Sequence, residues 1–317
     1  MTTFRQPDAS VVPVAVPVTR PVITIRLCAA LVAIYLLWGT SYLAIKQAGA
    51  ELPPLLLVGL RNLAAGVVLF GLVQVQGRYW GAPRLWLNAA LVGVLMISVG
   101  AVLLAMGITL VASGSAAVIF AGVPIVVCGF MALTGQRVTV AQWVGTGIGV
   151  FGLTLLNQDA LGALEQRGMW LILFSVVATA ASAVMMSRLP MPQDLIVSTS
   201  IQMLAGGGVA VIIGLLIGER LVPLSTQAFM AWLYLSLFVS VIGYLSYTYL
   251  MVKTGPVVAS SYAYVNPPVA LLAGSWLLGE HISSMALIAT GIVLVGAMTV
   301  LFATTPKTQS VPMAGID

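Results

Sequence analysis

The chain has 317 residues, of which 60% are hydrophobic and only 7% are charged, and its mean hydropathy is +1.10. Soluble domains carry about 25% charged residues, so this composition excludes a soluble domain with one anchor and indicates a polytopic membrane protein. The net charge of +5 is distributed one or two residues at a time between apolar segments, which is typical of membrane topology signals. It therefore does not indicate a nucleic-acid-binding surface.

Ten apolar segments follow one another along the chain. A helix needs about 20 apolar residues to cross the hydrocarbon core of a bilayer. The expected spans cover residues 27–46, 54–76, 86–109, 113–133, 140–157, 168–187, 195–218, 228–252, 257–278 and 282–303. We therefore predict an all-α polytopic membrane protein with ten transmembrane helices. Residues 1–26 and 304–317 are expected to form flexible cytoplasmic tails.

The positive charges predict how these spans are oriented. With the N-terminus inside, nine Lys and Arg residues fall on the inner side and three on the outer side. The inner residues are Arg5, Arg20, Arg26, Arg78, Arg84, Arg137, Arg188, Lys253 and Lys307, and the outer ones are Lys46, Arg167 and Arg220. Cytoplasmic loops carry the excess of positive residues, so both termini are expected in the cytoplasm, which requires an even number of spans.

The two halves of the chain resemble each other. At a shift of about 144 residues, Pro124 aligns with Pro268, and the tripeptide at 146–148 is repeated at 290–292. Two five-helix halves joined head to tail must enter the membrane with opposite orientation, because five is odd. Such inverted repeats suit alternating access. Duplication also builds channels and membrane enzymes, so the repeat does not decide the function.

Arg61 is the only charged residue in the interior of an apolar segment, since Lys46 stands at the end of its span. Arg61 lies about eight residues into the second span, roughly 12 Å deep at 1.5 Å per residue. A charge at this depth needs partners. One interpretation is that Arg61 faces a cavity and binds a substrate carboxylate. The other is that it snorkels outward or ties helices together through backbone carbonyls.

Two spans carry aromatic and hydroxyl side chains at helical spacing. These residues are Trp38, Ser41 and Tyr42 in the first span and Ser240, Tyr244 and Tyr247 in the eighth. A mixed surface of this kind suits an amino acid or another small amphipathic solute, because it offers apolar contact together with a few hydrogen bonds. The alternatives are tyrosines of the membrane interface and ordinary helix packing.

The ninth span contains a second candidate polar site. Tyr264 and Asn266 precede Pro267 and Pro268, and Pro124 occupies the matching place in the fourth span. Proline removes a backbone donor and frees carbonyls one turn earlier. Irregular backbone at membrane depth is tolerated where it lines a cavity or is buried in protein. We interpret the prolines as paired hinges beside a binding site, with kinked packing helices as the alternative.

Acidic residues are absent from all predicted spans, and the single histidine, His281, falls in the last outer turn. Proton-coupled carriers usually hold a titratable group within the membrane, so uniport or exchange is expected. The sequence also shows no His/Asp/Glu cluster, Gly-rich phosphate loop or metal-ligand spacing of the kind that enzymes need. We therefore expect no catalytic residue, no metal and no cofactor.

Four segments resemble motifs of the drug/metabolite transporter superfamily. Residues 35–42 resemble its first-helix signature, 61–66 the second-helix motif of EamA-type members, 261–267 the ninth helix, and Gly279-Glu280 the turn after it. Pro268 departs from the family pattern, where this position is usually apolar. The resemblance implies two inverted repeats, at residues 27–157 and 168–303, a central cavity, and a place in the bacterial inner membrane.

Within the family, the chain resembles metabolite and amino-acid exporters of the YedA/YddG type. This resemblance implies export of small metabolites, with amino acids as the expected class, by alternating access. The competing hypothesis is a proton-coupled exporter of cationic drugs, which the lack of intramembrane acid disfavours. The expected partners are a small-molecule substrate and the lipid bilayer, with no nucleic acid. The oligomeric state stays open and includes a monomer.

Overall fold

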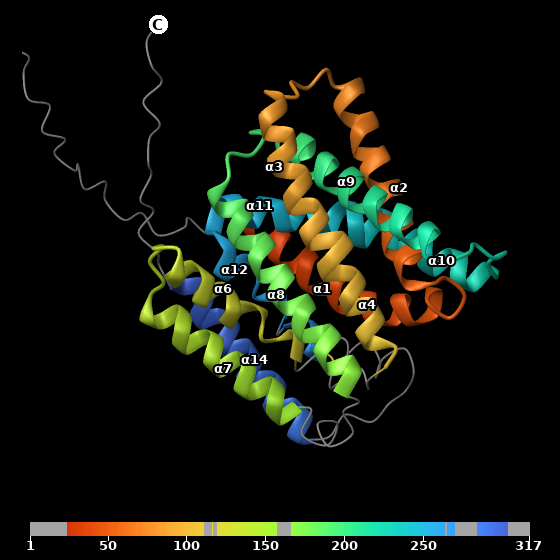
Figure 1. Cartoon of the computed structure of the whole chain (residues 1–317). Helices are drawn as coiled ribbons and strands as arrows, with labels where there is room; N and C mark the ends of the chain where they lie inside the picture. The colour runs from red at the N-terminus through yellow and green to blue at the C-terminus, as the bar shows by residue number, and fades with distance from the viewer. Residues whose placement is uncertain are drawn as a thin grey trace, which may run out of the picture.

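Figure 1 shows a computed structural model of the chain. It describes residues 24–110, 116, 119–156, 166–263, 265–269 and 284–303. Most of the expected first tail, the whole second tail, Tyr264, Gly279-Glu280 and His281 therefore lie outside the described residues. The described part of the chain is helical and contains no strand.

The helices of the first half occupy the five segments where the apolar pattern predicts them. They are α1 (Ile25–Ala48), α2 (Pro54–Val75), a third span of α3 (Pro83–Gly93), the π-helix η1 (Val94–Ala101) and α4 (Val102–Ile108), then α6 (Val123–Leu133) and α7 (Val140–Leu156). The described part of the fourth span is shorter than the predicted segment at 113–133, because several residues before Val123 lie outside the described part.

The second half follows the same plan. It comprises α8 (Gln166–Arg188), α9 (Leu195–Leu216), an eighth span of α10 (Thr226–Tyr234), the π-helix η3 (Leu235–Gly243) and α11 (Tyr244–Thr254), then α12 (Pro256–Ala259), helical residues 265–269 and α14 (Ser284–Phe302). Among the described helices, six are long and apolar enough to cross a membrane, and α6, α7 and α14 are shorter but also apolar.

Local sequence signals explain several helix ends. The Thr24 hydroxyl accepts a hydrogen bond from the Leu27 amide at the start of α1, and Asp194 caps α9 in the same way. Pro54 begins α2, where its missing N–H is not needed. Gly255 ends α11 with a φ of +86°, a conformation that glycine adopts without strain.

The second helices of the two halves, α2 and α9, pack closely and run antiparallel. A Cβ atom on Gly59 would lie 2.8 Å from the backbone nitrogen of Val211, and one on Gly66 would lie 2.9 Å from that of Leu204. Early residues of α2 therefore meet late residues of α9. Because the two helices are equivalent by sequence order, their opposite direction shows that the repeats are inverted.

The fifth helices, α7 and α14, repeat this arrangement (Figure 1). A Cβ atom on Gly145 would lie 2.9 Å from the backbone nitrogen of Val300, and one on Gly152 would lie 2.9 Å from that of Val293. This pair is also antiparallel, and small residues allow the backbones to approach. The predicted all-α fold with inverted repeats is confirmed.

The remaining spans form the centre of the molecule. The first span α1 packs against all three parts of the eighth span, and the sixth span α8 packs against η1 and α4 of the third span. The inverted repeat relates these two pairs to each other. Both the third and the eighth span contain a π-helix at their centre, and π-helices are frequent at functional sites.

Candidate functional site

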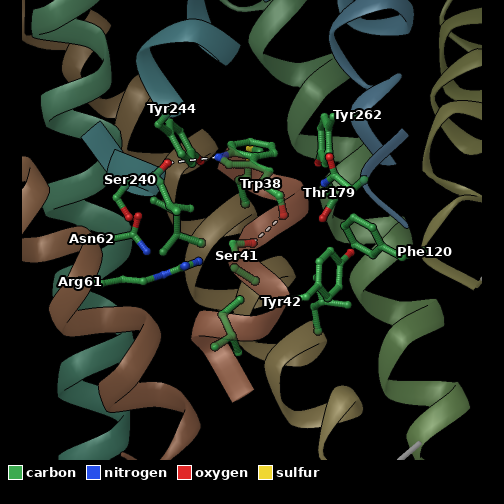
Figure 2. Close-up of a pocket in the computed structure, with 17 residues that line it drawn as sticks. Trp38, Ser41, Tyr42, Arg61, Asn62, Phe120, Thr179, Ser240, Tyr244 and Tyr262 are labelled. Carbon is green, nitrogen blue, oxygen red and sulfur yellow. Dashed lines mark hydrogen bonds between the residues drawn. The ribbon is translucent and has the colours of Figure 1, made fainter. Parts of the chain in front are cut away.

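A cavity of about 100 Å³ lies between the two repeats, and its wall includes residues of α1, α2, α8 and the third and eighth spans. Its polar and aromatic wall residues are Trp38, Ser41, Tyr42, Arg61, Asn62, Phe120, Thr179, Ser240, Tyr244, Tyr262 and Asn266, and its apolar ones are Ile45, Met96, Ile97, Ala101, Leu104 and Val239. Figure 2 shows that the labelled residues surround a common space and come from several helices.

The first helix supplies one continuous strip of the wall. Trp38, Ser41, Tyr42 and Ile45 all line the cavity, at the spacing of one helix face. The Trp38 indole N–H donates a 3.1 Å hydrogen bond to the Val239 carbonyl, and the Ser41 hydroxyl donates a 2.7 Å bond to the Trp38 carbonyl. The structure therefore places the three residues predicted from this span at the cavity.

Arg61 points from α2 into the same space (Figure 2). Its Nε and Nη1 atoms are buried and have no hydrogen-bond partner. The neighbouring Asn62 is held in place, because its Nδ2 donates a 2.8 Å bond to the Val58 carbonyl. These two buried nitrogens of Arg61 thus tie no helices together through carbonyls, and they are available to a ligand.

Two further polar atoms at this cavity are also buried without a partner. They are the Tyr244 hydroxyl and the Oδ1 atom of Asn266. Buried polar groups in proteins are almost always hydrogen-bonded, so a cluster of exceptions needs an explanation. A ligand that carries an acceptor for the arginine and a donor for the amide oxygen would satisfy all of them.

The side of the cavity towards the start of α1 is closed by four aromatic rings. The Trp38 and Tyr262 rings meet edge to face at 4.4 Å between centroids, and Trp38 and Tyr247 lie 5.5 Å apart. Tyr244 contacts both Trp38 and Tyr247. Beyond the rings, Ile34 is completely buried. The part of the cavity wall that α1 supplies therefore runs from Trp38 to Ile45.

Tyr247 does not line the cavity, which differs from the prediction. It is 1% exposed and packs beneath Trp38, one turn further along the eighth span than Tyr244. Ser240 and Tyr244, predicted from the same helix face, do reach the wall. The difference arises because the tryptophan already occupies the space through which Tyr247 would have to point.

The structure also locates the predicted ninth-span residues. Asn266 lines the cavity, whereas Pro267 and Pro268 are buried within helical residues 265–269 and do not line it. Pro124 is buried at the start of α6. Tyr264 lies outside the described residues. The role of the three prolines as hinges stays a prediction.

Several wall residues were not predicted from the sequence, among them Asn62, Phe120 and Thr179. Thr179 makes from α8 the same kind of contact that Trp38 makes from α1, but the 144-residue shift does not reveal this, because it pairs Trp38 with Ser182. The Thr179 hydroxyl lies 2.8 Å from where a Cβ atom on Gly100 would be, and the Trp38 indole covers Gly243 in the same way. Each contact joins a π-helix to the helix beside it, η1 to α8 and η3 to α1.

The described residues offer no group of three or more His, Cys, Asp or Glu side chains that could hold a metal ion. They also place no acid in the cavity wall. The arrangement has a single cation, hydroxyl and amide groups, and apolar and aromatic surface. These groups can offer hydrogen bonds, one positive charge and apolar contact to a small molecule.

Comparison with known proteins agrees with this architecture. Residues 25–158 and 166–302 each match the EamA-like transporter family. The chain is 37% identical to the "Uncharacterized inner membrane transporter YedA" of Escherichia coli (strain K12), over 86% of this chain and 89% of that protein. It is 25% identical to the "Uncharacterized transporter YvbV" of Bacillus subtilis (strain 168), over 89% of this chain and 93% of that protein.

A solved crystal structure shares the fold. It superposes with a TM-score of 0.71 at 20% identity, and the match covers 86% of this chain and 95% of the other. The two family matches, the inverted packing of the two repeats and the cavity between them all indicate the same architecture. The chain is therefore a multi-pass membrane transporter that belongs to the EamA-like transporter family of the drug/metabolite transporter superfamily.

Proposed function

We propose that this transporter exports small metabolites, with amino acids as the expected class, across the bacterial inner membrane by alternating access. One observation carries the proposal. The cavity between the inverted repeats contains Arg61, whose Nε and Nη1 atoms are buried and lack partners, and the described wall contains no acid. A positive site of this kind favours solutes that carry a carboxylate.

The other wall residues fit the rest of an amino acid. The unpaired Oδ1 of Asn266 can accept a hydrogen bond from an ammonium group. Met96, Ile97 and Leu104 provide apolar surface for a side chain. Small-molecule sites typically combine such apolar surface with a few convergent polar groups. The zwitterion thereby satisfies both kinds of unpaired atom at once.

The wall also bears on how transport is driven. A carrier that couples to protons usually needs a titratable group in the membrane, and no Asp, Glu or His lines the described cavity. We therefore propose uniport or exchange. The competing exporter of cationic drugs could use the aromatic rings around Trp38, because cations bind to ring faces. Arg61 opposes it, since it would repel a cation in the same cavity.

Transport into proteoliposomes tests the proposal. Purified protein is reconstituted, and uptake of labelled amino acids is measured with and without a pH gradient, with protein-free liposomes as the control. Uptake without the gradient would support uniport or exchange. Uptake only with the gradient would contradict the proposed coupling and keep the carrier. Movement of cationic dyes without movement of any amino acid would replace the proposal with the drug exporter.

A further inference from the structure

We propose that Arg61 must hold a compact anion before the carrier can reorient, so that the protein works as an exchanger and its empty form does not return. This inference rests on the proposed function and specifies its coupling. The required chemistry is a carboxylate or an inorganic anion of similar size. The substrate supplies it during transport, and an ion such as chloride could supply it in the absence of substrate.

Arg61 brings a permanent positive charge to the cavity. A guanidinium group stays protonated in proteins, so the cavity cannot lose this charge by releasing a proton. The described residues provide no acid in the cavity wall to balance it. Two of its three nitrogens are buried without any hydrogen-bond partner. The empty cavity therefore contains an uncompensated cation.

The charge of Arg61 makes closure of the empty cavity unfavourable. Alternating access requires a state in which the cavity is closed on both sides of the membrane. On the side where α1 begins, the closure is already made by the rings of Trp38, Tyr247 and Tyr262. These rings carry no negative charge that could balance Arg61. Closing the other side as well would seal this unpaired charge off from bulk water, which is strongly unfavourable.

A bound anion removes this obstacle to closure. A carboxylate would accept hydrogen bonds from the unpaired Arg61 nitrogens, and the unpaired Tyr244 hydroxyl could donate to the same ligand. The charge is then balanced locally and the donors are satisfied, so the closed state becomes accessible. The anion-loaded carrier thus reorients faster than the empty one, which is the kinetic definition of exchange.

Anion binding can be measured without transport. The purified protein is heated in detergent with sodium acetate, sodium chloride or the sodium salt of MES, a bulky sulfonate. We expect acetate to raise the unfolding temperature of the wild type relative to MES and to leave Arg61→Met unchanged. Arg84→Gln is the matched control, because Arg84 is exposed at the start of α3 and should respond like the wild type.

Three results of this measurement are informative. A chloride shift that also disappears in Arg61→Met would add the inorganic source, whereas an acetate shift alone would restrict the site to carboxylates, and both support the site. An equal acetate shift in Arg61→Met would place anion binding elsewhere and overturn the proposal. If Arg61→Met does not fold, Tyr244→Phe replaces it, and a weaker acetate shift than in the wild type is then expected.

Transport tests the coupling. Vesicles in MES buffer are loaded with unlabelled L-leucine or left without it, and uptake of labelled L-leucine is measured. We expect exchange to exceed net uptake by about tenfold or more, which corresponds to ~1.4 kcal/mol of barrier. Equal rates would overturn the exchange inference while leaving the carrier intact. No leucine movement in either case would count against amino-acid export, and the acetate measurement would still decide the anion site.

Discussion

The two ends of the central cavity are built on the same backbone plan and carry different side chains. Gly100 lies near the end of the π-helix η1, and Gly243 is the last residue of the π-helix η3. When the two repeats are aligned on these glycines, Tyr244 corresponds to Ala101 and Tyr247 to Leu104. Large aromatic rings close one side. At the equivalent positions of the other side the side chains are aliphatic, and they line the cavity.

Trp38 and Thr179 also differ in size, with the large aromatic residue on the closed side of the cavity and the small one on the other. Each residue covers the glycine of a π-helix, Gly243 or Gly100, but the indole also contacts three tyrosine rings. Inverted repeats make two backbone halves equivalent, and side chains then decide which half is filled. The cavity therefore lies on the side where the repeat has the smaller residues.

The most severe test of this comparison transfers an aromatic ring to the open side. Ala101→Tyr places a phenol at the position equivalent to Tyr244, where Ala101 lines the cavity. We expect the ring to fill a space of about 100 Å³ and to abolish transport while the protein still folds. Ala101→Ser is the matched control and should retain transport. Full activity of Ala101→Tyr would show that this cavity is not the transport route.

Removing the indole from the closed side should lower stability. Trp38→Ala loses the ring contacts with Tyr244, Tyr247 and Tyr262 and the hydrogen bond to the Val239 carbonyl. Large-to-small changes of this type cost about 3 kcal/mol. Denaturant unfolding in detergent measures the loss. Thr179→Ala, at the equivalent position, should cost much less, and equal losses would contradict the asymmetry.

The two π-helix glycines should tolerate alanine to different degrees. A Cβ atom on Gly243 would run into the indole of Trp38, a rigid ring, whereas one on Gly100 would meet the hydroxyl of Thr179. We expect Gly243→Ala to cost about 2 kcal/mol of unfolding free energy through overpacking, and Gly100→Ala about half as much.

The double variant Gly243→Ala/Trp38→Ala provides the control for this prediction. If the steric argument holds, the glycine change costs less when the indole is absent, and the two effects are not additive. Additive losses would mean that Gly243 is needed for the backbone of η3 itself and not for room beside Trp38.

The bilayer explains why so much of the fold could be predicted from the sequence. Helix length and charge placement are set by the hydrocarbon core and by topology, and both can be read from local composition. The inverted repeat could be predicted because each half of the chain has five spans, which is an odd number. Trp38, Ser41 and Tyr42 were predicted to line the site because α1 keeps regular helical spacing through the cavity.

The rest of the site depends on contacts that local sequence does not encode. The π-helix η3 changes the register of the eighth span, and nothing in its apolar sequence marks that change. Whether Tyr247 reaches the cavity depends on Trp38, a residue far away in the chain. Thr179 and Phe120 line the wall only because of how α8 and the fourth span pack against their neighbours.

The antiparallel pair α2 and α9 gives the smallest expected effects, and it shows the same inverted plan at its two ends. At one end Arg78, which follows α2, pairs with Asp194 at the start of α9, with a 2.5 Å contact. At the other end Glu219, which follows α9, accepts hydrogen bonds from the amides of Leu55 and Leu56 at the start of α2. Each end therefore has an acid at a helix N-terminus.

Asp194 should make stability depend on acid. Partial burial raises the pKa of its carboxyl group, but hydrogen bonds from Arg78 and from the Val197 and Ile196 amides outweigh this, so the pKa lies below its ordinary value of 3.8. A lowered pKa contributes stability that is complete above the ordinary pKa and is lost as the pH falls through the folded-state value. We expect Asp194→Ala to cost about 1 kcal/mol at neutral pH through the lost cap and to flatten the acid dependence of unfolding.

Arg78→Gln separates the two parts of this effect, because it removes the ion pair and keeps the cap. Both partners are partly exposed, at 35% and 25% of their side-chain surface, so solvent screens the pair and the expected loss is no more than about 0.5 kcal/mol. Denaturant unfolding at neutral and acidic pH measures both variants. A larger loss for Arg78→Gln than for Asp194→Ala would mean that the charge, and not the helix cap, fixes this end of the pair.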